Sequence, residues 1–537
     1  MNKIRIIALI LGLGALFLPV LINIPGLSLA GHITLGIFLM AAIFWVTEPI
    51  PIYATSLLVI LLQIMLLSVQ GPFASSSEVP LVEPQATDET YQWLIPEEAI
   101  SEEGKLFLMR NERQGSEITV IIVGEENGMV RVESPRLSEN QSLAADTEHW
   151  LLEFNPPPHT TFLNTLANPI IILFLGGFIL AASAVKYELD RNLTRIILKP
   201  FGNRPAFIML GLMLVTAVLS AFMSNTATTA MMMTVIIPIV RQLEGSDKFR
   251  IGLALCIPFA ANIGGMATPI GTPPNAVVIG ALSAQGISIP FGTWMVLTSP
   301  LAVVLLFLIW QLLLKFYPCQ EKRIKLQLEG AFLVSPRAII LYIVFGVTIL
   351  LWVTEALHGI SSSVIAFIPI ALLPAFKIIE KAEIRNLSWE VLWLMAGGIS
   401  LGLSMRDTGL ASWLIGLIGW EGMGTLMIMA VFGLVAVAMS NFISNTVAAT
   451  LLTPLAISLA LSPEMEGMMN LDITAVMIAV GASLGMALPI STPPNAIAIS
   501  TGMVRTPDMA KMGIIIGLGG VILAILTSRF YWPLILG

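Results

Sequence analysis

Charge is scarce in this sequence. Asp, Glu, Lys and Arg make up 11% of the 537 residues, whereas 56% are hydrophobic and the mean hydropathy is +0.88. So few charged side chains could not cover the apolar surface of a soluble protein. Stretches without charge that could cross a hydrocarbon core of roughly 30 Å occur at 6–22, 208–240, 251–314 and 422–463. The composition predicts a polytopic protein of the lipid bilayer, with no nucleic-acid partner.

Cysteine and histidine are also rare, and this excludes several kinds of site. Cys256 and Cys319 cannot form a disulfide framework or a zinc site. The four histidines form no ligand cluster in the sequence: His32, His149, His159 and His358. The apolar spans offer no paired acids and no nucleophile beside a base. We therefore expect no catalytic residue, no enzyme activity and no cofactor.

The chain contains two copies of one unit. Three short motifs recur at a spacing of 220 or 221 residues: "SNT" at 224–226 and 444–446, "TPPNA" at 272–276 and 492–496, and "GG" at 176–177 and 397–398. "WVTE" recurs at a larger spacing of 307 residues, at 45–48 and 352–355. The first copy therefore carries an insertion of about 86 residues.

The insertion corresponds to an acidic segment, 71–158, which holds 17 Asp and Glu against 5 Lys and Arg. "EITVIIVG" (117–124) and "GMVRVES" (128–134) are strand-like runs joined at Asn127-Gly128, a strong hairpin signal. The stretches 105–110 and 149–154 could add two strands. We expect a small β-rich domain, which fits a lid, a partner surface or a passive module equally.

Basic residues set the expected orientation, because Lys and Arg favour the cytoplasmic side. Lys3 and Arg5 place the N-terminus in the cytoplasm, and the apolar start reads as a retained first helix because it lacks a convincing cleavage site. Expected helices near 6–24, 32–47 and 49–68 then put the insertion outside the cell (inner) membrane. A fourth helix, near 169–185, returns the chain to the cytoplasm.

Residues 205–241 must leave and re-enter the cytoplasmic side, which predicts a re-entrant hairpin with "SNT" near its tip. The second copy starts from the opposite side, so the repeats are expected to be inverted, and hairpin 422–463 enters from outside. A helix near 512–532 leaves the C-terminus outside. The prediction is an all-α membrane protein with about eleven spans, two hairpins and the β-rich insertion, divided into 1–70 (first helix and scaffold helices), 71–158 (insertion), 159–316 (rest of repeat 1), 317–337 (cytoplasmic linker) and 338–537 (repeat 2).

Both recurring motifs break helices. Pro273-Pro274 and Pro493-Pro494 remove backbone donors and exclude a continuous helix. Inverted repeats with broken helices are typical of secondary transporters, whose sites lie near the bilayer midplane. Each break creates a helix N-terminus whose N–H groups suit an anion. The carbonyls set free, with Ser and Asn oxygens, suit a small hard cation such as sodium.

Fixed positive charge is missing from these segments. No Lys or Arg occurs in 214–240, 251–297, 422–463 or 473–504. A helix N-terminus offers an anion at most about 2 kcal/mol, whereas desolvating an ion costs several kcal/mol per charge. Four termini could balance a monoanion, but a dianion would need bound cations. The residues favour co-transport of a cation with an anion.

The paired "SNT" and "TPPN" motifs, "FLGGFIL" (174–180) and "WVTEPIP" (45–51) resemble the divalent anion/sodium symporter family of dicarboxylate, citrate and sulfate carriers. The resemblance covers the membrane part but not 71–158. It implies an elevator-type homodimer, a small anionic substrate and sodium as the coupling ion. By motif, one sodium would be bound by Ser220, Ser224, Asn225 and Gly271, and a second by Ser440, Asn445 and the backbone near Ser491. The substrate would contact Asn225, Thr226, Thr272, Asn445, Thr446 and Thr492.

Three other classes of protein are open. A sodium-independent anion exchanger should replace a sodium with a fixed positive charge, and the sequence shows none. An anion channel would not require two closed hairpins. An intramembrane enzyme would need reactive groups that the core spans do not offer. Neutral hydroxyl and amide donors suit succinate, citrate and sulfate alike.

Overall fold

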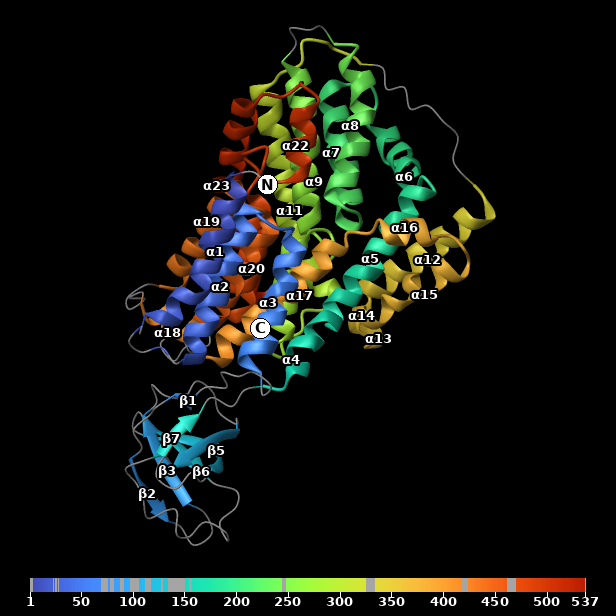
Figure 1. Ribbon diagram of the computed structural model, residues 1–537. Coiled ribbons are helices and arrows are strands. Elements are labelled where there is room, and N and C mark those ends of the chain that lie inside the picture. Colours follow the sequence, from blue (N-terminus) through green and yellow to red (C-terminus); the bar gives the residue numbers. More distant parts are fainter. Residues whose placement is uncertain are drawn as a thin grey trace. The chain divides into compact units, whose positions relative to one another are not determined.

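The computed structural model describes residues 3–22, 24, 27, 29–68, 157–243, 248–324, 334–417, 424–460 and 470–536, and seven strands between Ser76 and Glu153 (Figure 1). Packing divides the chain into two compact units. Unit 1 comprises Met1–Thr165 and Ser400–Gly419, and unit 2 comprises Leu166–Ile399 and Trp420–Gly537. Both "SNT" motifs and both "TPPNA" motifs belong to unit 2, so this division differs from the division into repeats.

Unit 1 contains α1 (Lys3–Leu21), α2 (Leu29–Thr47), α3 (Ile52–Leu67), α4 (His159–Asn164), the end of α17 (Trp389–Asp407) and α18 (Leu410–Gly416). α2 packs against both α1 and α3. A buried amide ties α3 to α17, because Gln63 Nε2 donates to Ser400 O at 3.0 Å and to Ser404 Oγ at 2.7 Å. Such an amide is stable in an apolar setting only when its hydrogen bonds are made.

The strands of unit 1 form one antiparallel sheet in the order β1-β7-β4-β5-β6-β3-β2. The stretches expected as strands coincide with β4 to β7, whose alternating or β-branched residues favour a pleated chain. The expected turn residues, Asn127 and Gly128, lie outside the described residues. The strand bounds are Ser76–Ser77 (β1), Val82–Ala86 (β2), Tyr91–Pro96 (β3), Leu106–Asn111 (β4), Glu117–Glu126 (β5), Met129–Glu133 (β6) and Trp150–Glu153 (β7).

Unit 2 consists of helices. The first copy contributes α5 (Pro169–Lys186), α6 (Leu189–Leu198), α7 (Pro205–Phe222), α8 (Asn225–Val240), α9 (Phe249–Met266), α10 (Pro273–Ser283) and α11 (Phe291–Phe316). The second contributes the start of α17 with α12 (Pro336–Val353), α13 (Glu355–His358), α14 (Ser362–Ile365), α15 (Phe367–Ala375), α16 (Lys381–Arg385), α19 (Thr425–Phe442), α20 (Asn445–Ala460), α21 (Leu471–Leu484), α22 (Pro493–Ser500), α23 (Thr506–Phe530) and α24 (Pro533–Leu536).

Eight helical segments of the described chain are long and apolar enough to cross a membrane: Leu29–Thr47, His159–Lys186, Pro205–Phe222, Phe249–Met266, Phe291–Phe316, Pro336–Val353, Thr425–Phe442 and Thr506–Leu536. Further apolar helices of 10–17 residues include most of α1 and all of α3, which we expect as spans. The second arms of both hairpins, α8 and α20, are also in this shorter class. The first arms, α7 and α19, belong to the eight longer segments.

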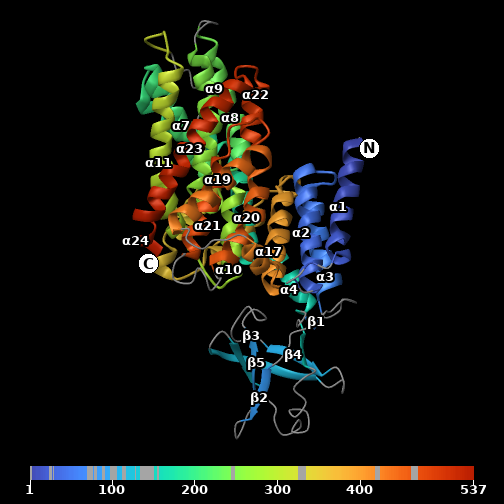
Figure 2. The same cartoon turned by 90° about the vertical axis from the view of Figure 1, so that its left-hand side faces the viewer.

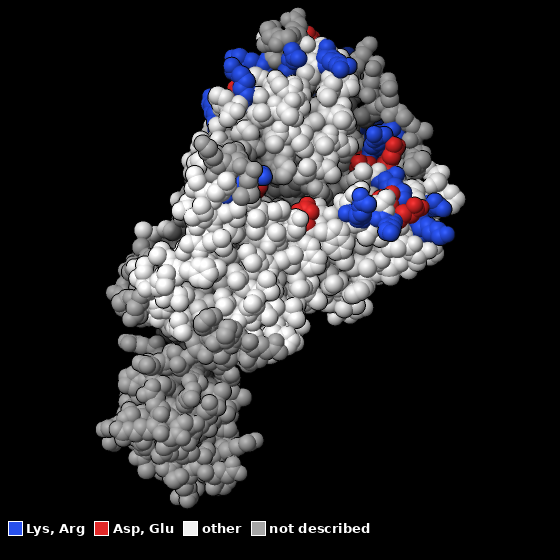
Figure 3. Space-filling view, viewed as in Figure 1, with Lys and Arg blue, Asp and Glu red and all other residues white. Residues whose placement is uncertain are grey.

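Charged side chains are concentrated in small parts of the surface. On the face shown in Figure 3, Lys and Arg gather at the upper end and around α6, α12 and α16, and most of the other described surface is uncharged. Lys186 Nζ, at the end of α5, lies 2.8 Å from Glu383 Oε1 in α16. The hydrogen bond from Lys186 lowers the pKa of Glu383 below its ordinary value.

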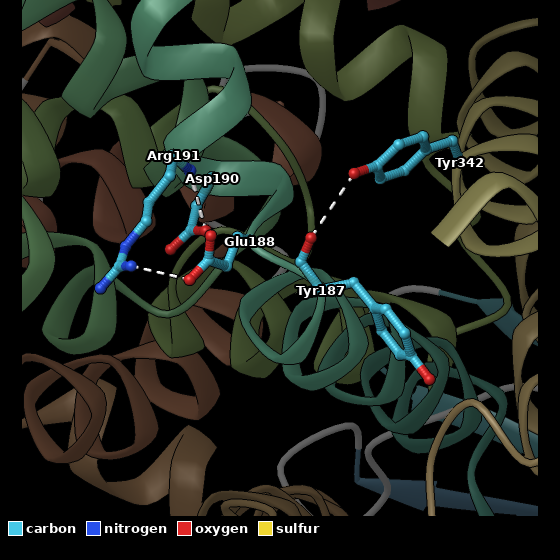
Figure 4. A network of polar contacts seen from close by, with 5 residues as sticks. All are labelled: Tyr187, Glu188, Asp190, Arg191 and Tyr342. Carbon is cyan, nitrogen blue, oxygen red and sulfur yellow. Dashed lines mark hydrogen bonds and ion pairs between the residues drawn. The ribbon is translucent and has the colours of Figure 1, made fainter. Parts of the chain in front are cut away.

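A polar network lies where α5 passes into α6 (Figure 4). Arg191 Nη1 pairs with Glu188 Oε1 at 2.7 Å, and the Arg191 N–H donates to Asp190 Oδ1 at 2.8 Å. The Tyr342 hydroxyl, from α12, points at the Tyr187 carbonyl at 3.5 Å, and the Tyr187 ring points away from it. Burial raises the pKa of Asp190. Asn192 of α6 donates to the same Tyr342 hydroxyl at 2.9 Å, so Tyr342 of α12 contacts both α6 and the end of α5.

Candidate functional site

The first hairpin turns back at its "SNT" motif. α7 ends just before Met223, and α8 begins at Asn225 after the non-helical Ser224. The fully buried Ser220 hydroxyl lies 2.5 Å from Asn225 Oδ1 and 2.9 Å from Ala261 O in α9. The tip of the hairpin is thereby fastened to α9.

The second hairpin repeats this arrangement. Ile443 and Ser444 interrupt the helical path, and Asn445 begins α20. The buried Ser440 hydroxyl lies 2.7 Å from Asn445 Oδ1 and 2.6 Å from Ala482 O in α21. Each copy therefore holds a triplet of oxygen atoms from a serine hydroxyl, an asparagine amide and a backbone carbonyl.

Each triplet has more acceptors than its single proton can serve. A serine hydroxyl carries one hydrogen, whereas the amide oxygen and the carbonyl only accept. Both acceptors of the first triplet lie within 2.9 Å of Ser220 Oγ, so one of them faces the hydroxyl without a hydrogen bond. A hard cation bound by neutral oxygens relieves such crowding. The alternative is an amide turned over so that its Nδ2 donates to the hydroxyl.

The "TPPNA" motifs begin the short helices α10 and α22. Thr272 and Thr492 stand immediately before these helices, and the two prolines fill the first two helical positions. Proline is favourable there because the first N–H groups of a helix have no partner within it. The motifs thus create two further helix N-termini in unit 2, as the prolines predict.

The asparagine of "TPPNA" fixes the unwound segment in front of each short helix. Asn275 Nδ2 donates to three backbone carbonyls, those of Gly265 at 3.1 Å, Met266 at 3.5 Å and Thr268 at 2.8 Å. Asn495 Nδ2 donates to Met486 O at 2.9 Å, Leu488 O at 3.0 Å and Ser491 Oγ at 3.2 Å. Neither asparagine is among the expected site residues. Their repetition at a spacing of 220 residues was the signal that could have identified them.

Two glycines allow the broken helices to approach the hairpins. A Cβ atom on Gly265 would lie 2.7 Å from Asn225 Oδ1 and 3.0 Å from Gly271 O. A Cβ atom on Gly485 would lie 2.3 Å from Ser440 Cβ. Both positions therefore require glycine. The Gly271 carbonyl, an expected sodium ligand, lies near the same point as the Asn225 amide.

The two copies are interlocked within unit 2. α22 of the second copy packs against α8 and α9 of the first, and α10 of the first packs against α20 and α21 of the second. Figure 2 shows α7, α8 and α22 toward one end of unit 2 and α10, α20 and α21 toward the other. Each "TPPNA" helix thus meets the second arm of the hairpin from the other copy.

The remaining expected residues are placed unequally. Ser224 and Thr226 are exposed at the first tip, and the Ser224 side chain makes no capping hydrogen bond. The other four are buried at the second tip or at the helix breaks: Thr272, Thr446, Ser491 and Thr492. In the described chain, no group of three or more His, Cys, Asp or Glu could hold a metal ion. A charged ligand at these segments would meet hydroxyls, amides, carbonyls and helix ends.

Comparison with known proteins shows the family to which this chain belongs. A family model described as "Citrate transporter" matches residues 150–481 and 349–536. The sodium-dependent dicarboxylate transporter SdcS of Staphylococcus saprophyticus is 31% identical over 409 residues, covering 69% of this chain and 78% of that protein. The sodium-dependent high-affinity dicarboxylate transporter 3 of Caenorhabditis elegans is 28% identical over 537 residues, covering 85% and 93%. The YdaH transporter of Alcanivorax borkumensis aligns with 90% of this chain and 99% of its own, at 11% identity and a TM-score of 0.49.

The class of protein follows from these matches and from the eight apolar helices. The chain is an integral membrane transport protein and not an enzyme. More specifically, it belongs to the citrate transporter family, and its curated relatives identify it as a carrier of the divalent anion/sodium symporter group.

Proposed function

We propose that this protein is a sodium-coupled symporter of a divalent or trivalent anion, with a dicarboxylate as the preferred substrate and citrate or sulfate as the alternatives. The pair of oxygen triplets carries the proposal, because each gathers neutral oxygens at the start of a helix. The relatives give independent support, since both are named as sodium-dependent dicarboxylate transporters.

One sodium would be bound near Ser220, Asn225 and the Gly271 carbonyl, and Ser224 could contribute its own carbonyl. The second would be bound near Ser440 and Asn445, with the backbone around Ser491. Carbonyl, amide and hydroxyl oxygens are the ligands that hard cations prefer. Two neutral cages can each hold one cation, and the pair would then offset the charge of a dianion.

The anion would bind at the helix starts beside these cations. Its expected donors are the amides of Asn225 and Asn445 and the four threonines that stand at the tips and breaks: Thr226, Thr272, Thr446 and Thr492. No Lys or Arg occurs in 214–240, 251–297, 422–463 or 473–504. Affinity for the anion should therefore depend on sodium.

We infer that the repeats are inverted and that transport follows an elevator mechanism within a homodimer in the cell membrane. The opposite placement of the two hairpins in Figure 2 supports the inversion. The gathering of basic residues at the end where α7 begins supports a cytoplasmic location for that end (Figure 3). From Lys3 and Arg5 at the start of the chain, we also propose a cytoplasmic N-terminus, with residues 71–158 and the C-terminus extracytoplasmic.

Uptake into proteoliposomes tests the proposal directly. An inward sodium gradient should concentrate labelled succinate inside, whereas an equal potassium gradient should not. Unlabelled citrate and sulfate then rank the substrates by competition. Uptake that ignores sodium but requires an anion trapped inside would replace the symporter with an exchanger, and fast dissipative flux under both gradients would replace it with a channel.

A further inference from the structure

One set of hydrogen bonds passes from the first copy to the second. Asn262 of α9 is 2% exposed, and its Nδ2 lies 3.3 Å from Thr492 Oγ1 and 3.4 Å from Asn495 Oδ1. The Asn495 amide is oriented by its own three acceptors, which take its Nδ2 and leave its Oδ1 toward α9. The group opposite must therefore be a donor, and the Asn262 NH2 provides it.

Within the described part of the chain, the other copy shows no equivalent bond. In each copy an alanine carbonyl contacts the hairpin serine, that of Ala261 in the first and Ala482 in the second. The next residue is Asn262 in the first copy and Ser483 in the second. Ser483 Oγ donates within its own helix, to Ala479 O at 2.9 Å. Asn275 Oδ1 corresponds to Asn495 Oδ1, and it is buried without a hydrogen-bond partner among the described residues. Among the described residues, the hydrogen bonds thus tie the second break, and not the first, to the opposite copy.

Two adjacent residues of α9 thus contact the two half-sites. The Ala261 carbonyl belongs to the first oxygen triplet, with Ser220. Asn262 contacts the second "TPPNA" break at Thr492 and Asn495. If binding at one half-site shifts α9, the other half-site would move as well, because a single peptide unit separates the two contacts. Such a shared element is what energetic coupling between two sites requires.

We propose that Asn262 is a positioning residue that couples the two sodium-binding half-sites, by holding the second break in register with the helix that carries the first triplet. This inference rests on the proposed sodium symport. Asn262 itself is not assigned as a ligand of sodium or substrate. Its removal should leave both oxygen triplets in place and weaken their communication.

The test compares Asn262→Leu and Asn262→Ala with Ser483→Ala in proteoliposomes that contain equal amounts of folded protein. Leucine has the same number and branching of side-chain heavy atoms as asparagine but no donor, so it limits the cavity that alanine would leave. Ser483→Ala is the matched control at the corresponding position. Initial succinate uptake is measured over a range of sodium concentrations, and thermal unfolding is followed with and without sodium.

Both Asn262 variants should raise the half-saturating sodium concentration roughly three- to tenfold, the loss expected for one or two hydrogen bonds between neutral groups. Their Hill coefficient for sodium should fall toward one, while the Ser483 variant keeps the wild-type values. A wild-type sodium curve in either folded Asn262 variant would overturn the coupling role. So would failure of both to fold beside a folded Ser483 variant, since Asn262 would then serve folding alone. Absence of sodium-driven uptake in the wild type would instead refute the proposed function.

Discussion

Replacing Asn225 or Asn445 with alanine should weaken sodium and anion binding together. Each asparagine presents its Oδ1 to a serine hydroxyl at a hairpin tip, at 2.5 Å in the first and 2.7 Å in the second. Its Nδ2 carries two hydrogens that an anion can accept. The substitution removes one cation ligand and one anion donor, while the serine and the backbone carbonyl stay. A hydrogen bond to a charged group is worth about 1.5–3 kcal/mol, or roughly ten- to a hundredfold in affinity.

The assay is anion binding at several sodium concentrations for the wild type and both variants. Thr216→Val is a suitable control, because the buried Thr216 hydroxyl lies in the same helix as Ser220 and donates within that helix, to Leu212 O at 2.6 Å. By thermodynamic linkage, sodium must improve anion binding by the same factor by which the anion improves sodium binding. In the variants, the anion should therefore also fail to improve sodium binding. The reasoning would be refuted for either asparagine if its alanine variant kept wild-type anion affinity at low sodium.

Three further predictions follow from other parts of the chain. Gly485→Ala should lower the thermal unfolding temperature in detergent by an overpacking cost of about 1–3 kcal/mol, whereas Gly346→Ala, with no atom within 4 Å of the added Cβ, should not. Glu383→Gln should make the stability of the fold less sensitive to acid. Because the pKa of Glu383 is lowered in the folded protein, the ionised carboxylate stabilises the fold fully above the ordinary pKa of 4.5, and this stabilisation is lost as the pH falls from there through the lowered pKa. Unfolding curves over a pH series measure the effect, and unchanged acid sensitivity would contradict it. Deleting 72–157 and joining the ends with a short flexible linker should preserve sodium-driven uptake, and complete loss in a folded, inserted protein would assign the insertion a part in transport.

Local chemistry explains which features could be predicted from the sequence. Helix starts at Asn225, Asn445 and the two proline pairs were predictable, because proline and short polar residues interrupt helices wherever they occur. The stretches with alternating or β-branched residues in 105–154 were recognisable as strands for a similar reason. The basic residues between Lys186 and Arg204 indicated only a cytoplasmic segment, and the structure forms α6 within it, with Leu189 and Leu198 buried.

Contacts between distant residues explain what the sequence could not reveal. Asn262 and Thr492 are 230 positions apart, and their contact depends on α22 packing against α9. No local pattern distinguishes Asn262 from other polar residues in apolar helices. The exposure of Ser224 and Thr226, compared with the burial of Thr446, likewise depends on what packs over each tip.

The exchange of helices between the copies has a consequence for biosynthesis. α10 ends at Ser283, but the helix against which it packs, α20, is complete only when Ala460 has been synthesised. Unsatisfied backbone groups cost several kcal/mol each in lipid, so the unwound segment before α10 cannot face lipid during that interval. We therefore expect the insertion machinery to shelter the nascent first copy until the second copy arrives. A ribosome stalled between the copies should yield a product that quality-control proteases remove, and a lesion in α20 should impair maturation of the half made before it.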